Sequence, residues 1–182
     1  MAKRGDVIEN PVTGERIVFR KTARETNGEL LQFELLLKPH GFVPAEHIHS
    51  RQEERVEVTS GLVRYRLGGE EEDLSAGQAA VLPPAIPHTL WNDTDDEAHL
   101  LMEVRPALSV ETALETLFGL ARDGKTNNKG MPNPLHGALL AREYDLFLAG
   151  PPIPLQRAGM TVLAPLARLL GYRARYPQYS GD

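Results

Sequence analysis

The order of apolar and polar residues changes character near Pro106. Before it, short apolar runs alternate with turn signals such as Asn27-Gly28 and Ser60-Gly61. Many short strands separated by regular turns are typical of a β-sandwich, a barrel or a jelly roll. After Pro106, apolar residues recur at steps of three and four, which is the period of an amphipathic helix. The pattern predicts a mainly β fold, with a barrel over residues 1–106 and a helical extension over residues 107–182.

Three helical segments are expected in the extension. The first lies within residues 109–124, between a capping serine and a glycine, and the second within residues 133–150, where an Asn-Pro start precedes a Gly-Pro-Pro stop. A third apolar segment covers residues 156–170, and Pro165 is expected to kink or split it. We expect this extension to pack on the barrel or on a dimer partner, and to contribute no metal ligand.

Two histidines, His47 and His49, stand two positions apart in a segment with strand character. Side chains at positions i and i+2 of a strand point to the same face, so both imidazoles can bind one ion. A further histidine, His88, opens a later predicted strand after a proline-rich entry. These three residues are candidate metal ligands.

A carboxylate ligand is expected from the adjacent pair Glu53 and Glu54. Strand alternation allows only one of the two to face inward. If Glu54 faces the interior, Val56 and Val58 follow it, whereas the opposite register would bury Arg55. Glu54 is therefore the predicted fourth ligand.

The set His47, His49, Glu54 and His88 offers three imidazole nitrogens and one carboxylate. The chain contains no cysteine, so a metal here has only nitrogen and oxygen ligands. This set suits one divalent ion of Mn, Fe, Ni, Co, Cu or Zn, and the sequence does not choose among them. Four protein ligands leave coordination positions open, which is typical of a reactive site rather than a structural one.

These positions resemble the two motifs of the cupin superfamily. The similar segments read Gly41, five residues, His47-Ile48-His49, four residues, Glu54, six residues, Gly61, and then Gly77, five residues, Pro83-Pro84-Ala85, two residues, His88, three residues, Asn92. Alanine stands at position 85 where the family pattern has glycine. Because alanine tolerates a positive φ poorly, we expect that turn to differ slightly.

The resemblance covers about residues 28–106 and implies a single-barrel cupin, a double-stranded β-helix with the ion near its centre. It does not imply one reaction, because the fold hosts many. Other cupins with this ligand set include oxygenases that cleave diketones and flavonols, oxalate enzymes and acid decarboxylases.

Alternation also predicts the wall of the barrel interior. The inward positions of residues 31–37, 63–67 and 100–104 are apolar apart from one phenol, Tyr65. No second carboxylate or other acid–base group is expected near the metal, so no catalytic residue is assigned. Such a wall favours a small, fairly hydrophobic substrate or ligand whose oxygens bind the ion.

Two classes of function fit this site. The first is a metal-dependent enzyme, either dioxygenase-like or a related isomerase or cyclase. The alternative is a non-catalytic module that uses the metal to bind or sense a small molecule. A DNA-binding regulator is disfavoured, because no basic element accompanies the barrel.

Charge and hydropathy limit the partners and the location. The net charge is -5 without a basic stripe, so no nucleic-acid partner is expected. No apolar run approaches the roughly 18 residues of a membrane span, and none follows the N-terminal charges as in a signal peptide. We therefore expect a cytoplasmic protein without a membrane partner. A homodimer is expected, because the edge strands of small jelly rolls are commonly covered by a partner.

Three further histidines, His40, His99 and His136, are expected at the surface rather than in the metal site.

Overall fold

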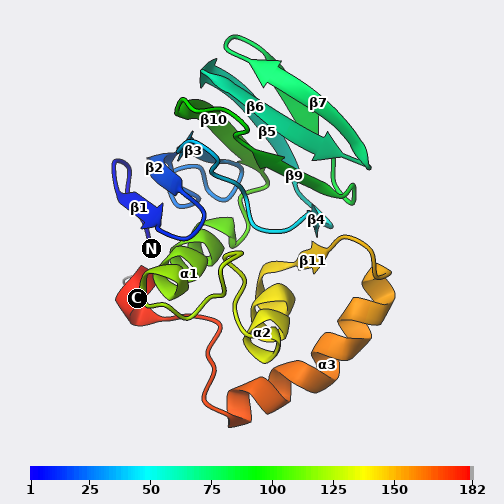
Figure 1. Cartoon of the computed structure of the whole chain (residues 1–182). Helices are drawn as coiled ribbons and strands as arrows, with labels where there is room; N and C mark the ends of the chain where they lie inside the picture. Colours follow the sequence, from blue (N-terminus) through cyan, green and yellow to red (C-terminus); the bar gives the residue numbers. More distant parts are fainter. Residues whose placement is uncertain (181–182) are drawn as a thin grey trace.

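Two antiparallel sheets form the barrel in a computed structural model that describes residues 1–180 (Figure 1). Their strands precede Pro106, except for β11, which comes from the C-terminal extension. The six-stranded sheet has the order β1-β2-β3-β10-β5-β8, and the five-stranded sheet has the order β11-β4-β9-β6-β7. The strands of the first sheet are β1 (Val7–Asn10), β2 (Glu15–Lys21), β3 (Leu31–Leu37), β5 (Glu53–Ser60), β8 (Ala79–Leu82) and β10 (Ala98–Arg105). Those of the second are β4 (His47–His49), β6 (Leu62–Leu67), β7 (Glu70–Ser75), β9 (His88–Trp91) and β11 (Leu146–Leu148).

Side chains from both sheets meet in one apolar core. Along β3 the odd-numbered residues from Leu31 to Leu37 are buried and the even-numbered ones are half-exposed. The same alternation buries Leu100, Met102 and Val104 on β10. These inward faces are the ones that strand periodicity predicts, so the barrel interior is confirmed at both strands.

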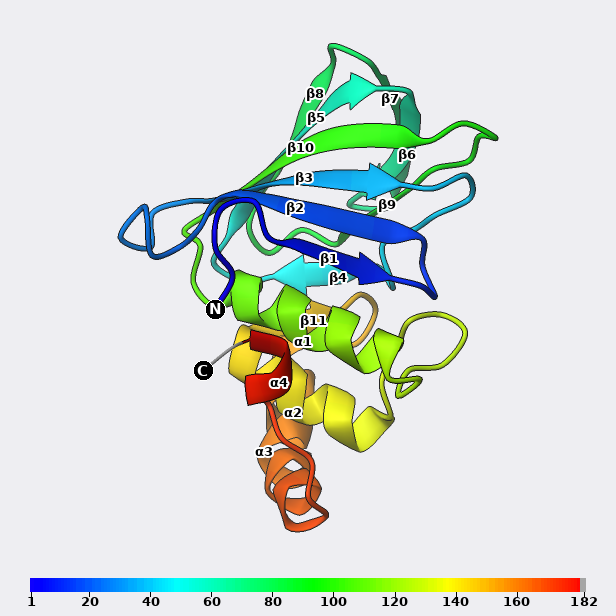
Figure 2. The same cartoon turned by 90° about the vertical axis from the view of Figure 1, so that its left-hand side faces the viewer.

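Four helices lie together at one end of the barrel, beneath β1 and β4 in the view of Figure 2. They are α1 (Val110–Arg122), α2 (Pro134–Tyr144), α3 (Ile153–Leu169) and α4 (Pro177–Ser180). The predicted start of the second helix is confirmed, because the Asn133 side chain accepts a hydrogen bond from the Leu135 N–H at 3.0 Å. None of the helices within residues 1–180 combines the length and hydropathy of a membrane-spanning segment.

The second helix ends earlier than its apolar pattern indicates. Asp145 adopts a left-handed conformation with φ of 56°, and the next residues form β11. This strand pairs with β4, with Leu146 opposite His49 and Leu148 opposite His47. The β4 edge offers backbone hydrogen bonds to this segment, and tertiary pairing therefore outweighs its helical periodicity.

Pro165 does not split the third helix, which is continuous from Ile153 to Leu169. A proline removes its own N–H donor and crowds the preceding turn. Ala164 and Ala167 are fully buried against Leu139 of α2. This packing holds the two halves in one helix despite the lost hydrogen bond.

The surface position expected for His136 is wrong. Its side chain is buried under the returning C-terminal segment, where Nε2 donates a hydrogen bond to the Arg173 carbonyl oxygen at 2.9 Å. The Tyr172 ring lies 5.0 Å from the imidazole. Burial lowers the pKa of His136, which favours its neutral form. His40 is exposed and His99 is half-exposed, with side chains 68% and 44% accessible, as expected for surface positions.

The turn before β9 keeps a left-handed residue although alanine occupies it. Ala85 has φ of 64°, and its N–H donates a hydrogen bond to the His49 carbonyl oxygen at 2.8 Å. Ala85 therefore adopts a conformation that favours glycine. The turn ties the entry of β9 to the end of β4.

We predict that Ala85→Gly stabilises the protein by roughly 0.5–1 kcal/mol. Relief of the left-handed conformation outweighs the greater entropy of glycine in the unfolded chain. Ala76→Gly is the matched control, because Ala76 is an exposed turn residue that is not among the residues with positive φ. Urea unfolding of the two variants measures the difference. Equal destabilisation of both would contradict the prediction.

Candidate metal centre

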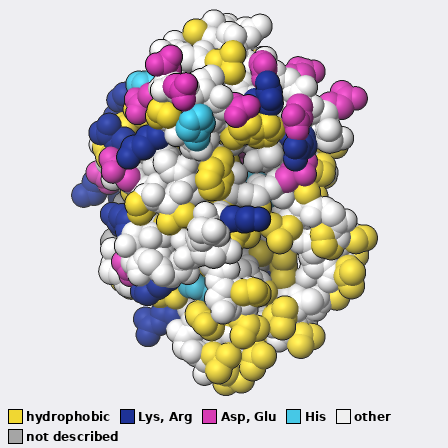
Figure 3. Space-filling view, in the orientation of Figure 1, with side chains coloured by type: hydrophobic (Ala, Val, Ile, Leu, Met, Phe, Trp, Pro, Cys, Tyr) yellow, Lys and Arg dark blue, Asp and Glu magenta, His cyan; other side chains and the backbone are white. Residues whose placement is uncertain are grey.

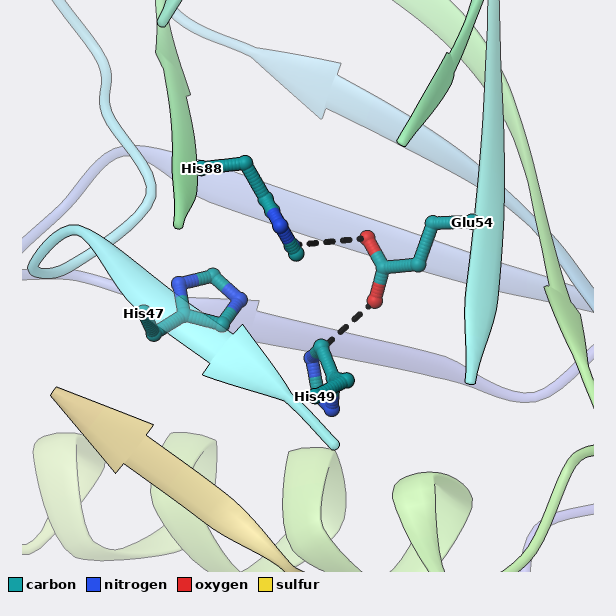
Figure 4. Close-up of side chains that lie close together, drawn as sticks. All are labelled: His47, His49, Glu54 and His88. Atoms are coloured by element: carbon teal, nitrogen blue, oxygen red, sulfur yellow. Dashed lines mark ion pairs between the residues drawn. The ribbon is translucent and has the colours of Figure 1, made fainter. Parts of the chain in front are cut away.

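His47, His49, Glu54 and His88 point toward one another inside the barrel (Figure 4). His47 and His49 come from β4, Glu54 from β5 and His88 from the start of β9. His47 lies directly opposite His88 in the β4–β9 pair. Their ligand atoms all lie within 4.8 Å of one another. Four residues from three strands thus converge on one point.

The three imidazole rings and the Glu54 carboxylate lie close enough together to surround one ion. The imidazole centroids of His47 and His88 are 4.6 Å apart, and those of His47 and His49 are 5.0 Å apart. The Glu54 carboxylate lies between two of the rings. Its Oε1 is 3.1 Å from His49 Nε2, and its Oε2 is 3.6 Å from His88 Nε2.

Backbone carbonyls fix the orientation of two of the imidazoles. His47 Nδ1 lies 3.1 Å from the Ala45 oxygen, and His88 Nδ1 lies 3.0 Å from the Ile86 oxygen. A carbonyl oxygen only accepts, so Nδ1 carries the proton and Nε2 keeps its lone pair. Metal-binding histidines are commonly oriented in this way.

The donor set fits a divalent ion. His88 Nε2 is buried and has no hydrogen-bond partner among residues 1–180, which is costly for a polar atom unless another ligand satisfies it. The carboxylate of Glu54 supplies one negative charge next to the three imidazoles. The cluster can therefore hold one metal ion, with N and O ligands only.

Burial and the charges of neighbouring residues together determine the protonation of His47 and Glu54. Burial lowers the pKa of His47 to about 3, and the charges of His49 and His88 act in the same direction. Burial opposes ionisation of Glu54, but the charge and hydrogen bond of His49, together with His88 and His47, outweigh it and lower the pKa of Glu54 to about 2. A neutral imidazole and an ionised carboxylate are the forms that bind metal.

The two glutamates of β5 face opposite sides of the sheet. Glu54 is 8% exposed, whereas Glu53 is an exposed residue. Val56 and Val58 follow Glu54 into the core and are fully buried. Alternation therefore predicts the orientation correctly, and metal binding by Glu54 stays a prediction.

The cluster opens on a cavity of about 590 Å³ between the barrel and the extension. Side chains from α1, α2 and α3 form much of its wall, in addition to the inward residues of the strands. The wall includes Ile17, Phe33, Leu35 and Met102 from the barrel and Leu114, Phe118, Tyr144 and Met160 from the extension. The wall expected from the strands alone is therefore incomplete.

Two details of the predicted wall need correction. Tyr65 is buried, but its hydroxyl donates a hydrogen bond to Glu72 at 2.8 Å, and it is not among the residues that line the cavity. A second carboxylate, Glu15, does line the cavity that contains the metal cluster. The sequence pattern that could have predicted this position is the alternation of Glu15 with Ile17 and Phe19, which places all three residues on the inward face of β2.

The comparisons with known proteins agree with this architecture. Residues 33–104 match the family model described as "Cupin domain". Among curated proteins, no sequence matches the chain. With an RmlC-like cupin from Shewanella frigidimarina, the identity is 19%, the TM-score 0.50, and the coverage 59% of this chain and 88% of that one. A predicted oxalate decarboxylase from Thermotoga maritima is 16% identical with a TM-score of 0.51, and the match covers 58% of this chain and 99% of that one.

A sugar phosphate isomerase from a cupin superfamily in Silicibacter pomeroyi has 22% identity and a TM-score of 0.47, and the match covers 53% of this chain and 62% of that one. At such identities the solved structures show the fold alone. Residues 33–104 therefore match a cupin domain, and the two solved structures with a TM-score of 0.50 or above share its fold. The chain consists of one cupin barrel followed by a C-terminal helical extension.

We predict that Glu54→Gln sharply lowers the metal content of the purified protein, because it removes the single carboxylate of the cluster and keeps its shape. The matched control is Glu53→Gln, which changes an exposed residue and should alter stability by no more than roughly 0.5 kcal/mol. Elemental mass spectrometry measures metal per chain in both variants. Loss of metal in Glu53→Gln alone would place the strand one residue out of register.

Proposed function

We propose that this cupin is a metal-dependent enzyme that acts on a small, fairly apolar, oxygen-bearing substrate. One divalent transition ion binds to His47, His49, Glu54 and His88. The observation that carries the proposal is the convergence of these four donors at the wall of an apolar cavity. The reaction is of the dioxygenase type or a related isomerisation or cyclisation, and the protein is cytoplasmic.

The ion, when bound, supplies Lewis acidity and open coordination positions. The chain provides the remaining requirements. The carbonyls of Ala45 and Ile86 hold two imidazoles in the ligand orientation, and Glu54 offsets part of the charge of the ion. Apolar side chains exclude water around the cluster, which strengthens electrostatic interactions with a bound oxygen group.

The size and chemistry of the cavity support the substrate class. A volume of about 590 Å³ lies within the roughly 300–1,000 Å³ that small-molecule pockets occupy. The wall is formed mainly by aliphatic, methionine and phenylalanine side chains. A substrate that fills it buries mostly carbon and directs its oxygens toward the metal cluster.

We predict that the purified protein carries about one transition metal per chain, and that metal-loaded protein consumes oxygen or converts at least one member of a panel of phenols and diketones. His88→Ala should remove both properties, because it deletes a buried ligand. Elemental analysis and oxygen-electrode and chromatographic assays measure them. Tight binding without turnover would instead support a non-catalytic binding or sensing module, and unchanged metal content in His88→Ala would refute the metal site.

We also propose a homodimer formed through α3. Leu155, Val162, Leu166 and Leu169 recur at steps of seven, four and three and are 65%, 71%, 44% and 85% exposed. Figure 3 shows hydrophobic side chains gathered over the region that α3 occupies in Figure 1. An apolar helix face of this kind is typical of a protein–protein contact.

For the dimer, we predict a mass of two chains in light scattering at micromolar concentration. The double variant Val162→Lys, Leu169→Lys should give one chain, because two charges would enter the contact. A wild-type protein that is monomeric at this concentration would overturn the dimer proposal and leave the metal site unaffected.

A further inference from the structure

Glu15 is a buried carboxyl group that the metal centre does not use. It is 5% exposed and lies at the start of β2, on the same inward face as Ile17 and Phe19. Its side chain lines the cavity that contains the metal cluster. A carboxyl group in an apolar wall is costly to bury unless a hydrogen-bond partner compensates it.

One protein hydrogen bond to this carboxyl group is found among residues 1–180. The Thr13 hydroxyl donates to Glu15 Oε2 at 2.7 Å. Burial raises the pKa of Glu15 to about 7, although the Thr13 hydrogen bond acts in the opposite direction. The carboxyl group is therefore substantially protonated near neutral pH, and its protonated form can donate a hydrogen bond to an oxygen atom in the cavity.

The strand registers place Glu15 and the metal cluster at different ends of one cavity wall. Glu15 pairs with Leu37 at the end of β3, whereas Leu31 at its start pairs with Val104, the neighbour of Glu54 on β5. The two rows are six residues apart along β3, from Leu31 to Leu37, which is about 20 Å of strand.

Apolar side chains cover the wall between these two polar ends. Phe33 and Leu35 are the inward residues of β3 between the two rows, and both line the cavity. Ile17 and Met102 line the same stretch from the neighbouring strands. The cavity therefore has a metal-ligand cluster toward one end, a carboxyl group toward the other, and carbon between them.

The hairpin that carries Glu15 is locally fixed. Asn10 lies opposite Glu15 in the β1–β2 pair, and its side-chain oxygen accepts hydrogen bonds from the Val12 and Thr13 N–H groups at 3.1 and 3.4 Å. Thr13 in turn binds the carboxyl group. The group is thus held in place before any ligand arrives, as expected for a recognition site.

We propose that Glu15 is a specificity-determining residue that binds a neutral oxygen group, a hydroxyl or a carbonyl, at the end of an elongated substrate remote from the metal. The inference rests on the proposed function, because the other end of the same substrate binds the ion. It narrows the substrate class to amphipathic molecules with oxygen groups at both ends of an apolar body.

The experiment uses alkyl hydroxamic acids as probes, since their head groups bind transition metals. Zinc-loaded full-length protein is titrated by calorimetry with octano-, decano- and dodecanohydroxamic acid and with the ω-hydroxy analogue of each. At the chain length that spans the two ends, the ω-hydroxyl should tighten binding about tenfold, the effect of one additional hydrogen bond in a dry site.

Two variants separate the hydrogen bond from the shape of the side chain. Glu15→Met has a similar length without a hydrogen-bonding group and should abolish the ω-hydroxyl advantage. Glu15→Gln retains a donor and should keep part of it. Zinc content and circular dichroism establish that each variant is folded and loaded. His88→Ala tests whether the hydroxamate head group binds the metal, and it should weaken binding of both probe series.

Each outcome has a distinct meaning. Absence of hydroxamate binding to the wild-type protein would contradict the metal site itself. Binding of both series with equal affinity at every chain length, or an ω-hydroxyl advantage that persists in Glu15→Met, would overturn the role of Glu15 and leave the metal site standing. Tighter binding of ω-amino than of ω-hydroxy analogues would show that Glu15 binds a cation and would overturn the neutral-oxygen assignment.

Discussion

The two-residue alternation of the barrel strands determines which polar groups leave water, and the site depends on this constraint. Glu54 and Glu53 are chemically identical neighbours on β5, yet only Glu54 enters the interior. A shift by one residue would exchange them and would also expose Val56 and Val58. The apolar core therefore stabilises the register that brings the carboxylate to the three histidines.

Desolvation makes the polar groups of the metal-ligand cluster depend on one another. Glu54 and His88 are almost fully buried, so their charges and lone pairs are poorly compensated by solvent. The cluster compensates within itself, through the contact between Glu54 and His49 at 3.1 Å, and the carbonyls of Ala45 and Ile86 engage the outer nitrogens of two rings. A divalent cation would complete the compensation. Removal of one partner would leave the others buried without it, which costs more than any single contact contributes.

The sequence predicts the barrel and the converging donors, because both depend on patterns within short segments. His47 and His49 share a face through their spacing, and Glu54 follows from the apolar residues after it. The features that the sequence did not predict depend on contacts between distant segments. Phe147 fits a helical period, yet its segment pairs with β4, and His136 is buried only because residues 172–176 return over it. Glu15 alternates with Ile17 and Phe19, but its place in the cavity follows from the packing of two sheets against the extension.

The extension is part of the site through the same strand that carries two of the donors. β11 pairs with β4 along its length, and Asp145, just before β11, binds Ser50 and Arg51, just after β4. The positions of His47 and His49 are therefore coupled to α2 and α3. The donor set is specified by local motifs in the barrel, whereas the cavity wall combines strands with helices outside the matched cupin domain. Under the proposed function, the wall selects the substrate and the donors bind the ion, so the same donor set can serve different substrates when the extension differs.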